Sequence, residues 1–155
     1  MANRHLLFLD KKASSSGQVK PPSADELLEH YTAEQLRAFF FAQALGKRSV
    51  SFRPKPFDPQ AKENDPVLKE GNVLTNAFNR SARSCFYTAQ KYCDGVMPTD
   101  APGDEVLRAC ETAVLDYEAA MLQHEFHVAW DAVAALVRDI NQRWTRAKPF
   151  RDECP

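Results

Sequence analysis

Apolar side chains recur every three or four residues through most of the chain after residue 65, which is the period of an α-helix with one buried face. Three segments follow this pattern: 65–94, about 104–124 and about 126–146. Their apolar positions are, in that order, Leu74, Phe78, Ala82, Cys85, Ala89 and Cys93; Leu107, Cys110, Val114, Tyr117 and Met121; and Phe126, Trp130, Val133, Val137, Ile140 and Trp144. These segments predict a mainly α fold in which this half of the chain is an antiparallel helical bundle.

The first 64 residues contain shorter elements and predict a small mixed α/β region. Residues 4–9 are largely apolar and predict a short strand, and Val50 and Phe52 alternate with polar residues as in a second one. Prolines at 54, 56 and 59 exclude a helix after that strand. We therefore predict two parts, 1–64 and 65–155, with the boundary in this proline-rich segment.

Helix ends are indicated by local signals. Ser23 with Glu26, and Thr32 with Gln35, are capping boxes that predict two helix starts, the second helix running from about Ala33 to Leu45. Gly46 is expected to end that helix in a left-handed conformation. In the second part, Asp65–Pro66 predicts a helix start and Gly95 a helix end, whereas the junction between the last two helices, near His124, has no glycine or proline to mark it.

The charge and the cysteines narrow the classes of protein. The net charge is −1 and the isoelectric point is about 6.4, which argues against a protein that coats nucleic acid through bulk electrostatics but leaves room for a local base-binding site. No apolar run reaches the length of a membrane span, and the apolar part of MANRHLLFLD is too short to predict a secretory signal peptide. The four cysteines, Cys85, Cys93, Cys110 and Cys154, form no Cys-x-x-Cys pair and predict structural thiols in a cytoplasmic protein.

Metal and nucleophile chemistry is poorly supported. His124 and His127 are three residues apart, but no third ligand completes a zinc pattern, so we predict structural or surface histidines and no metal site.

The polar flank of segment 65–94 is more informative, because it carries amides, an arginine and a tyrosine where a solvated face usually carries Glu and Lys. Such groups bind base edges and stack on bases, although an ordinary polar helix face has about equal weight on composition alone. The flank consists of Asn72, Asn76, Asn79, Arg83, Tyr87 and Gln90.

The stretch DKKASSSG, residues 10–17, has two interpretations. Its lysines, hydroxyls and glycine could gather phosphate oxygens, or the segment could be a flexible linker. Composition alone favours the linker.

Three longer stretches resemble the C-terminal part of bacterial methionyl-tRNA synthetases, which are class I aminoacyl-tRNA synthetases. The stretches are KKASSSGQVKPPSADELLEHYTAEQLRAFF, DPVLKEGNVLTNAFNRSARSCFYTAQKYCDG and HEFHVAWDAVAALVRDINQRW. The resemblance covers nearly the whole chain in order, and its most specific part is residues 79–95. It implies that residues 1–64 are a phosphate-loop and connecting region and that residues 65–155 are a helical anticodon-binding domain without its last helix.

The resemblance also implies site residues. Lys12, Ser14 and Ser16 match the Lys-Met-Ser-Lys-Ser signature that steadies the phosphates of ATP, whereas Ser15 replaces its second lysine, for which Lys11 is a candidate substitute. Asn79 and Arg83 match the Asn-x-x-x-Arg pair that hydrogen-bonds the first base of the C-A-U anticodon. Phe150 takes the place of a base-stacking tryptophan, whereas Trp144 is predicted to be core.

The function implied is the tRNA-binding part of a methionine-tRNA ligase. ATP with Mg²⁺ and methionine are implied for the full enzyme, and no cofactor is expected in this chain, which alone is predicted to be inactive and to bind the anticodon loop of tRNA(Met) weakly. No DNA or membrane partner is expected, and apolar surface left by the missing helix predicts self-association. A free-standing RNA-binding module and a structural or interaction bundle are the alternatives.

Overall fold

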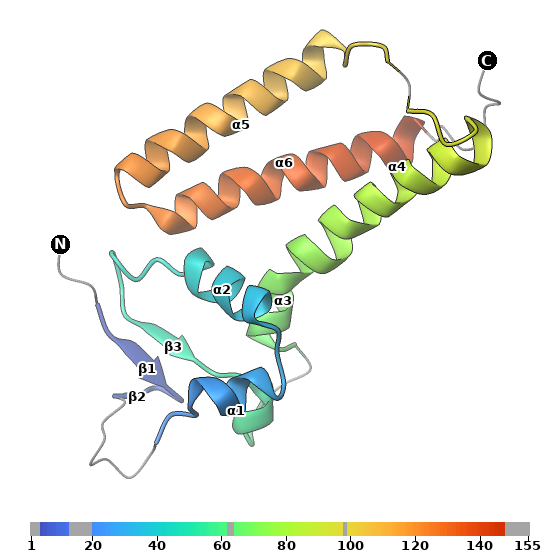
Figure 1. Ribbon diagram of the computed structural model, residues 1–155. Coiled ribbons are helices and arrows are strands. Elements are labelled where there is room, and N and C mark those ends of the chain that lie inside the picture. The colour runs from blue at the N-terminus through green and yellow to red at the C-terminus, as the bar shows by residue number, and fades with distance from the viewer. Residues whose placement is uncertain (1–3, 13–19, 62–63, 98, 148–155) are drawn as a thin grey trace.

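The computed structural model describes residues 4–12, 20–61, 64–97 and 99–147. Its N-terminal part contains a small sheet of three strands, β1 (Leu6–Phe8), β2 (Lys11–Lys12) and β3 (Val50–Phe52), in the order β2-β1-β3 (Figure 1). Strand β1 pairs antiparallel with β2 and parallel with β3, so the sheet is mixed. The predicted strands at 4–9 and around Val50 are both present, and they lie side by side.

A two-residue turn joins β1 to β2. Leu9 and Asp10 have φ angles of 48° and 65°, the left-handed conformation that suits a tight hairpin but is uncommon for residues other than glycine. The residues of β3 hold this turn: the Leu9 N–H donates to the Phe52 carbonyl at 3.2 Å, and the Asp10 N–H donates to Ser51 Oγ at 3.0 Å.

Two short helices follow, α1 (Ala24–Leu28) and α2 (Ala33–Ala42), and both begin with the predicted capping boxes. The predicted end of α2 is wrong, because the helix stops at Ala42 and Gly46 is not left-handed. Gln43 ends the helix instead: its backbone turns extended, with ψ at 135°, and its side-chain Nε2 donates to the Phe39 carbonyl at 3.1 Å. A side-chain amide thus donates to a carbonyl at the end of the helix, where backbone N–H groups would donate in a turn at a left-handed glycine.

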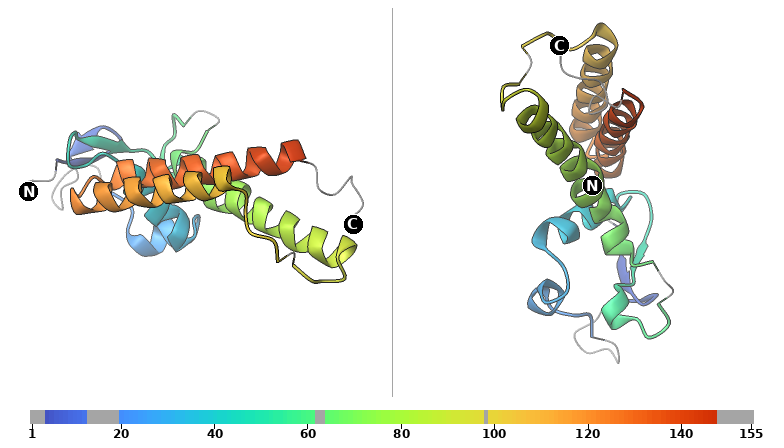
Figure 2. Two further views of the ribbon diagram at one scale, coloured as in Figure 1. Left: turned by 90° about the horizontal axis from the view of Figure 1, so that it is seen from above. Right: turned by 90° about the vertical axis from the view of Figure 1, so that its right-hand side faces the viewer.

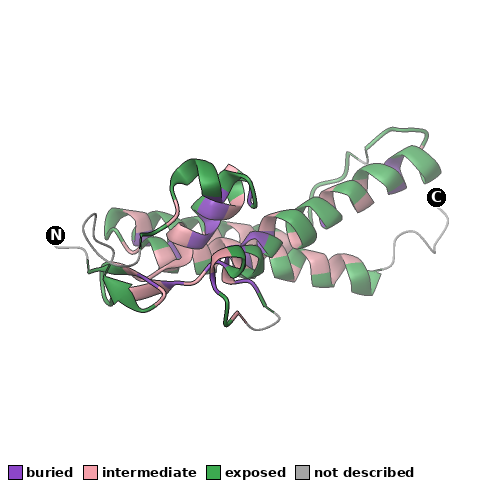
Figure 3. Ribbon diagram, turned by 90° about the horizontal axis from the view of Figure 1, so that it is seen from below, coloured by how far each residue is buried: buried purple, intermediate pink, exposed green. Residues whose placement is uncertain are grey.

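The main hydrophobic core lies between the sheet and the first helices, where buried residues concentrate (Figure 3). Its aromatic members contact one another; the ring centroids of Phe39 and Phe52, for example, are 5.2 Å apart. Val67, from the next part of the chain, is also a member and is fully buried. The core cluster consists of Phe8, Leu27, Tyr31, Leu36, Phe39, Phe52 and Val67.

A short 3₁₀ helix, η1 (Lys55–Phe57), lies in the proline-rich segment where no helix was predicted. It can form because Pro54 and Pro56 are at its start, where their missing N–H groups are tolerated. It precedes the predicted helix start at Asp65 and Pro66. The Asp65 side chain is buried and accepts four hydrogen bonds. Its Oδ1 accepts from the backbone N–H groups of Val67 and Leu68, and its Oδ2 accepts from the Tyr31 hydroxyl at 2.5 Å and from the Lys55 N–H at 3.1 Å. One carboxylate therefore caps a helix and ties it to the N-terminal core.

The predicted long helix is present as three consecutive elements, α3 (Pro66–Asn72), the π-helical η2 (Val73–Phe78) and α4 (Asn79–Tyr92). The predicted stripe of buried apolar residues does not hold through it, because Phe78 is 54% exposed whereas Ser81 and Thr88 are buried. A π turn holds more residues than an α turn, so it rotates the positions after it relative to a constant 3.6-residue period. The end at Gly95, with φ at 79°, is as predicted.

Two long helices complete the described chain, α5 (Asp104–Leu122) and α6 (Phe126–Ala147). The turn between them is centred on His124, which has a φ of 59° and so adopts the left-handed conformation although it is not a glycine. The predicted buried face of α5 is wrong in part: Leu107 and Val114 are 42% and 52% exposed, and Ala120 is the buried residue of this helix. On α6 the buried residues are also small, Ala129 and Ala134.

Helix α6 lies at the centre of the helical part, with α5 antiparallel beside it, α2 against its start and η2 packed against it further along (Figure 1). Helix α4 contacts α6 near its own start and then splays away from the α5–α6 pair (Figure 2). Large apolar residues are consequently exposed on the outer helices, among them Phe86, Leu115 and Leu122. No helix in the described ranges is long and apolar enough to cross a membrane. The predicted class, mainly α with a small N-terminal mixed sheet, is confirmed.

Candidate nucleic-acid interface

The polar flank predicted on the long helix is an exposed stripe that runs from the last residue of α3 along η2 and α4. All six of its residues are exposed, and Asn76, Asn79, Arg83 and Tyr87 line one shallow hollow of about 720 Å³. Four of the six side chains therefore lie together around one hollow, and Asn79 and Arg83 are two of these four.

Helical geometry explains how Asn79 and Arg83 share one face. They are the first and fifth residues of α4, one turn apart, so their side chains lie one above the other. The Asn79 N–H donates to the Leu74 carbonyl, five residues back, which is the bond that closes the π segment. Neither side chain has a hydrogen bond or an ion pair within the described part of the chain, so both are free to bind a ligand.

Tyr87 contributes a ring that is 61% exposed at the far end of the hollow. The Lys91 ammonium lies 5.6 Å from the centroid of this ring and 5.1 Å from that of Tyr92. Hydrogen bonding to Tyr92 and Tyr87 raises the pKa of Lys91, which therefore stays positively charged beside the tyrosines. An exposed ring with a cation beside it suits stacking on a base next to a phosphate.

The sequence interpretation missed three residues of the hollow, Thr75, Arg80 and Ser84. A signal for Arg80 is present in the sequence, because Asn76 and Arg80 repeat the Asn-x-x-x-Arg spacing of Asn79 and Arg83 three residues earlier. The two pairs line the same hollow, which lacks a carboxylate among its lining residues, all of them described.

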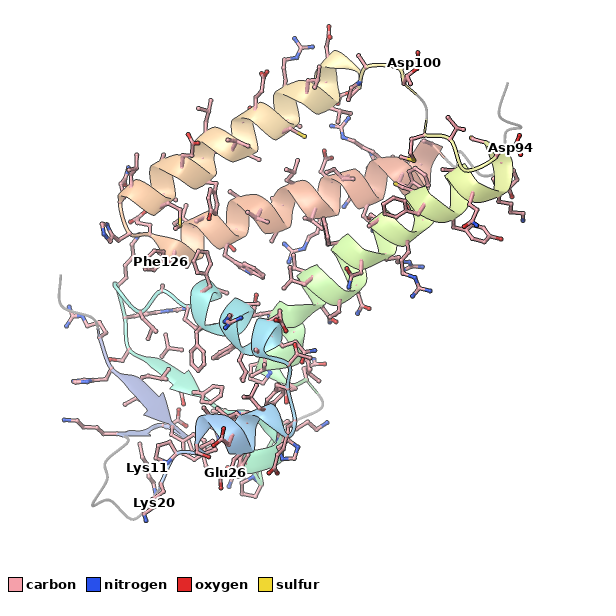
Figure 4. The ribbon with its side chains drawn as sticks, in the orientation of Figure 1. Lys11, Lys20, Glu26, Asp94, Asp100 and Phe126 are labelled. Carbon is pink, nitrogen blue, oxygen red and sulfur yellow. The ribbon has the colours of Figure 1, made fainter. Side chains whose placement is uncertain are left out.

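The two described lysines of the predicted phosphate loop, Lys11 and Lys12, lie at the other end of the described structure. Lys11 belongs to the sheet, far from Asp94, which follows the end of α4 (Figure 4). Lys12, the residue predicted to contact phosphate, is in β2 beside Lys11, and both are exposed. Ser14 and Ser16 lie outside the described residues, so the loop itself remains a prediction.

The predicted stacking residue, Phe150, also lies outside the described residues. Trp144, predicted to be core, is partly buried near the end of α6. Two other exposed rings lie close to the hollow in sequence: Phe86, 68% exposed, directly precedes Tyr87, and Phe78, 54% exposed, directly precedes Asn79.

The histidines and cysteines show no assembled ligand set. In the described ranges there is no group of three or more His, Cys, Asp or Glu side chains that could hold a metal ion. His124 and His127 lie instead beside Phe126, Lys47 and Glu125 around a separate hollow of about 390 Å³. Cys85 and Cys110 are free thiols, and burial raises the pKa of the Cys85 thiol, which disfavours the reactive thiolate.

Comparison with known proteins supports the resemblance at a coarse level. No family model matches the chain. The chain is 20% identical over 152 residues to methionine-tRNA ligases of Bacillus cereus (strain G9842) and Bacillus anthracis (strain CDC 684 / NRRL 3495), an alignment that covers 98% of this chain and 26% of each relative. It therefore spans about a quarter of the length of the curated relatives it matches, and it is distantly similar to that portion of methionine-tRNA ligases.

Proposed function

We propose that this chain is the tRNA-binding portion of a methionine-tRNA ligase and that the hollow on α4 binds an anticodon base. The observation that carries the proposal is the placement of Asn79 and Arg83. Both are exposed, both lack partners in the described part of the chain, and both line one carboxylate-free hollow with Asn76 and Tyr87.

The chemistry of these groups suits a base. The Asn79 amide can donate and accept at once, as the edge of a base requires, and the Arg83 guanidinium can donate two parallel hydrogen bonds to a base or a phosphate. The Tyr87 ring offers a surface for stacking. The distant similarity to methionine-tRNA ligases along the whole chain supports C-A-U as the sequence that is bound.

The wider assignments belong to the same proposal. Residues 1–64 would connect the RNA-binding helices to an ATP-binding part of the protein, with Lys12, Ser14 and Ser16 as the phosphate-contacting loop. Lys11 is the candidate for the missing second lysine of that loop. Charging of tRNA(Met) with methionine, using ATP and Mg²⁺ in the cytoplasm, would be the activity of the whole enzyme.

The test measures binding of the purified chain to an RNA hairpin with a C-A-U loop and to one with a U-A-C loop, at low salt. We expect tighter binding of the C-A-U hairpin by about tenfold, the scale of one bidentate contact to a base. Asn79→Ala and Arg83→Ala should abolish this preference, whereas Arg37→Ala should not, because Arg37 is exposed on α2 outside the hollow. Equal binding of both hairpins by the wild-type chain would refute the proposal and favour a structural bundle.

A further inference from the structure

A second, smaller hollow borders the first one and lies between the long helix and α6. It has a volume of about 260 Å³ and shares Asn76 and Arg80 with the hollow that contains Asn79 and Arg83. Its lining residues are Lys69, Asn72, Val73, Asn76, Ala77, Arg80, Arg138 and Asn141. The two hollows therefore form one continuous surface, with Asn76 and Arg80 at the junction.

The second hollow concentrates positive charge in a chain whose net charge is −1. Lys69, Arg80 and Arg138 are all at least partly exposed, and none has an ion pair within the described ranges. The eight lining residues include no carboxylate. Three cations gathered without a counter-charge repel one another, and an anion bound among them would relieve that repulsion.

The acidic residues next to these cations in sequence are engaged elsewhere. Glu70 accepts a hydrogen bond from Trp130 Nε1 at 3.3 Å, and Asp139 accepts one from Arg143 Nε at 2.6 Å. Arg143 also pairs with Glu105 of α5 at 3.0 Å. Carboxylates that could have neutralised Lys69 and Arg138 thus serve contacts on other faces of the helices.

The amides of the hollow are oriented by bonds that leave N–H groups free. Asn141 Oδ1 accepts from the Ser81 hydroxyl at 3.2 Å, so Asn141 Nδ2 is available to donate. Asn72 Oδ1 accepts from Asn76 Nδ2 at 2.6 Å, which leaves Asn72 Nδ2 available as well. Cations and N–H donors together are the groups that bind phosphate oxygens.

We propose that this second hollow binds backbone phosphates of the RNA strand whose base is bound beside Asn79 and Arg83. This inference rests on the proposed function for the choice of RNA as the polyanion. The shared residues Asn76 and Arg80 place phosphate binding directly beside base binding, as the alternation of base and phosphate in one strand requires. Lys69 and Arg138 would then supply affinity without sequence preference, whereas Asn79 and Arg83 supply the preference.

The test uses Arg138→Gln and Lys69→Gln with the same two hairpins over a series of salt concentrations. Each variant should weaken binding of both hairpins by the same factor, about three- to tenfold at low salt, and leave their ratio unchanged. The slope of log affinity against log salt should fall by about 0.7 to 0.9 for each phosphate that the variant no longer binds. Arg108→Gln is the matched control, because Arg108 is exposed on α5 in a different hollow, beside Asp116 and Asp139.

Two results would overturn the inference: wild-type affinity and salt slope in both variants, or an equal change in Arg108→Gln, which would indicate bulk charge alone. The base-binding proposal is tested separately by the ratio of the two hairpins. If the wild-type chain shows no C-A-U preference but the two variants still lower the salt slope, phosphate binding stands and base binding fails. If the affinity ratio of the two hairpins depends on Arg83 but the salt slope is the same in the Lys69 and Arg138 variants as in the wild type, base binding stands and this inference fails.

Discussion

At the scale of single residues, Asp65 joins a helix cap to the N-terminal core. It caps α3 with one oxygen and accepts from the Tyr31 hydroxyl and the Lys55 N–H with the other. Both Tyr31 and Asp65 are buried, at 5% and 7% exposed. A buried carboxylate is tolerated when its oxygens are satisfied in this way, so the pair fixes α3 against the core.

The Tyr31–Asp65 contact predicts a pH dependence of stability. Burial, followed by the hydrogen bond to Asp65 and its negative charge, raises the pKa of the Tyr31 hydroxyl far above its usual value near 10. The folded state therefore keeps this proton at pH values where the unfolded chain loses it. The contribution is full below about pH 10 and is lost as the pH rises further, because ionisation then favours the unfolded state.

Urea unfolding at pH values from 8 to 11, roughly the range that brackets an ordinary tyrosine, checks this prediction. The free energy of unfolding should fall more steeply above about pH 10 in the wild type than in Tyr31→Phe, which lacks the ionisable group. Tyr117→Phe is the control, since Tyr117 is exposed on α5 and its replacement should leave the wild-type profile in place. Parallel profiles for wild type and Tyr31→Phe would contradict the assignment.

At the scale of elements, Gly71 allows α3 to approach α2 closely. A Cβ atom added at Gly71 would lie 2.9 Å from Gln35 Cγ and 3.6 Å from Gln35 Cα. The Gln35 side chain cannot move away without cost, because its Oε1 accepts a hydrogen bond from the Thr32 N–H as part of the capping box that begins α2. A larger residue at position 71 would therefore disturb both the packing of α3 against α2 and the capping bond of α2.

Gly71→Ala should lower the free energy of unfolding by about 1–3 kcal/mol, the usual range for overpacking, although alanine is the better helix former. Gly46→Ala is the matched control, because a Cβ there meets nothing within 4 Å and the backbone is not left-handed. That variant should be neutral or slightly stabilised. Chemical denaturation of both variants checks this difference in the free energy of unfolding. Equal stability of the two variants would show that the Gln35 side chain moves aside without cost.

The elements also show which features a sequence can predict. The caps at Ser23, Thr32 and Asp65 and the stop at Gly95 are predictable because each depends on a few neighbouring residues. The end of α2 is not, because the Gln43 side chain replaces the expected glycine. A search for a constant 3.6-residue period cannot detect the π segment. It therefore predicts that Phe78 is buried, whereas Phe78 is exposed.

The candidate site also has one part that the sequence predicts and one part that it does not. The spacing of Asn79 and Arg83 places both on one face of a helix, and the structure puts them in one hollow. Arg138 lies much further along the chain and joins Lys69 and Arg80 only because α6 packs against η2. No local pattern contains that contact.

At the scale of the whole molecule, α2 connects the sheet to the helices. It contacts α3 and α6, and the Phe41 ring centroid is 5.4 Å from that of Phe126 and 6.4 Å from that of Trp130. Val67 meanwhile belongs to the same core cluster as Phe8. Side chains on both sides of the predicted boundary at residue 64 thus pack together, which predicts one cooperative unfolding unit.

Hydrogen exchange resolved to peptides checks this cooperativity. Peptides from β1 and from α6 should report the same free energy of opening, and Phe41→Ala should lower both by about 2 kcal/mol, less than for a fully buried ring. Phe86→Ala is the control, as its 68% exposed ring should change neither by more than about 0.5 kcal/mol. A fall confined to α6 would show that the two parts unfold separately.

The position of Lys11 and Lys12 has a consequence unrelated to any ligand. They form one of the two edge strands of the described sheet, and an edge presents unpaired N–H and C=O groups to which a second molecule can add a strand. Successive residues of a strand point to opposite faces, so these two lysines place positive charge on both sides of that edge. Two molecules that met along it would bring their ammonium groups together, and the pair thereby protects the β2 edge against the addition of further strands.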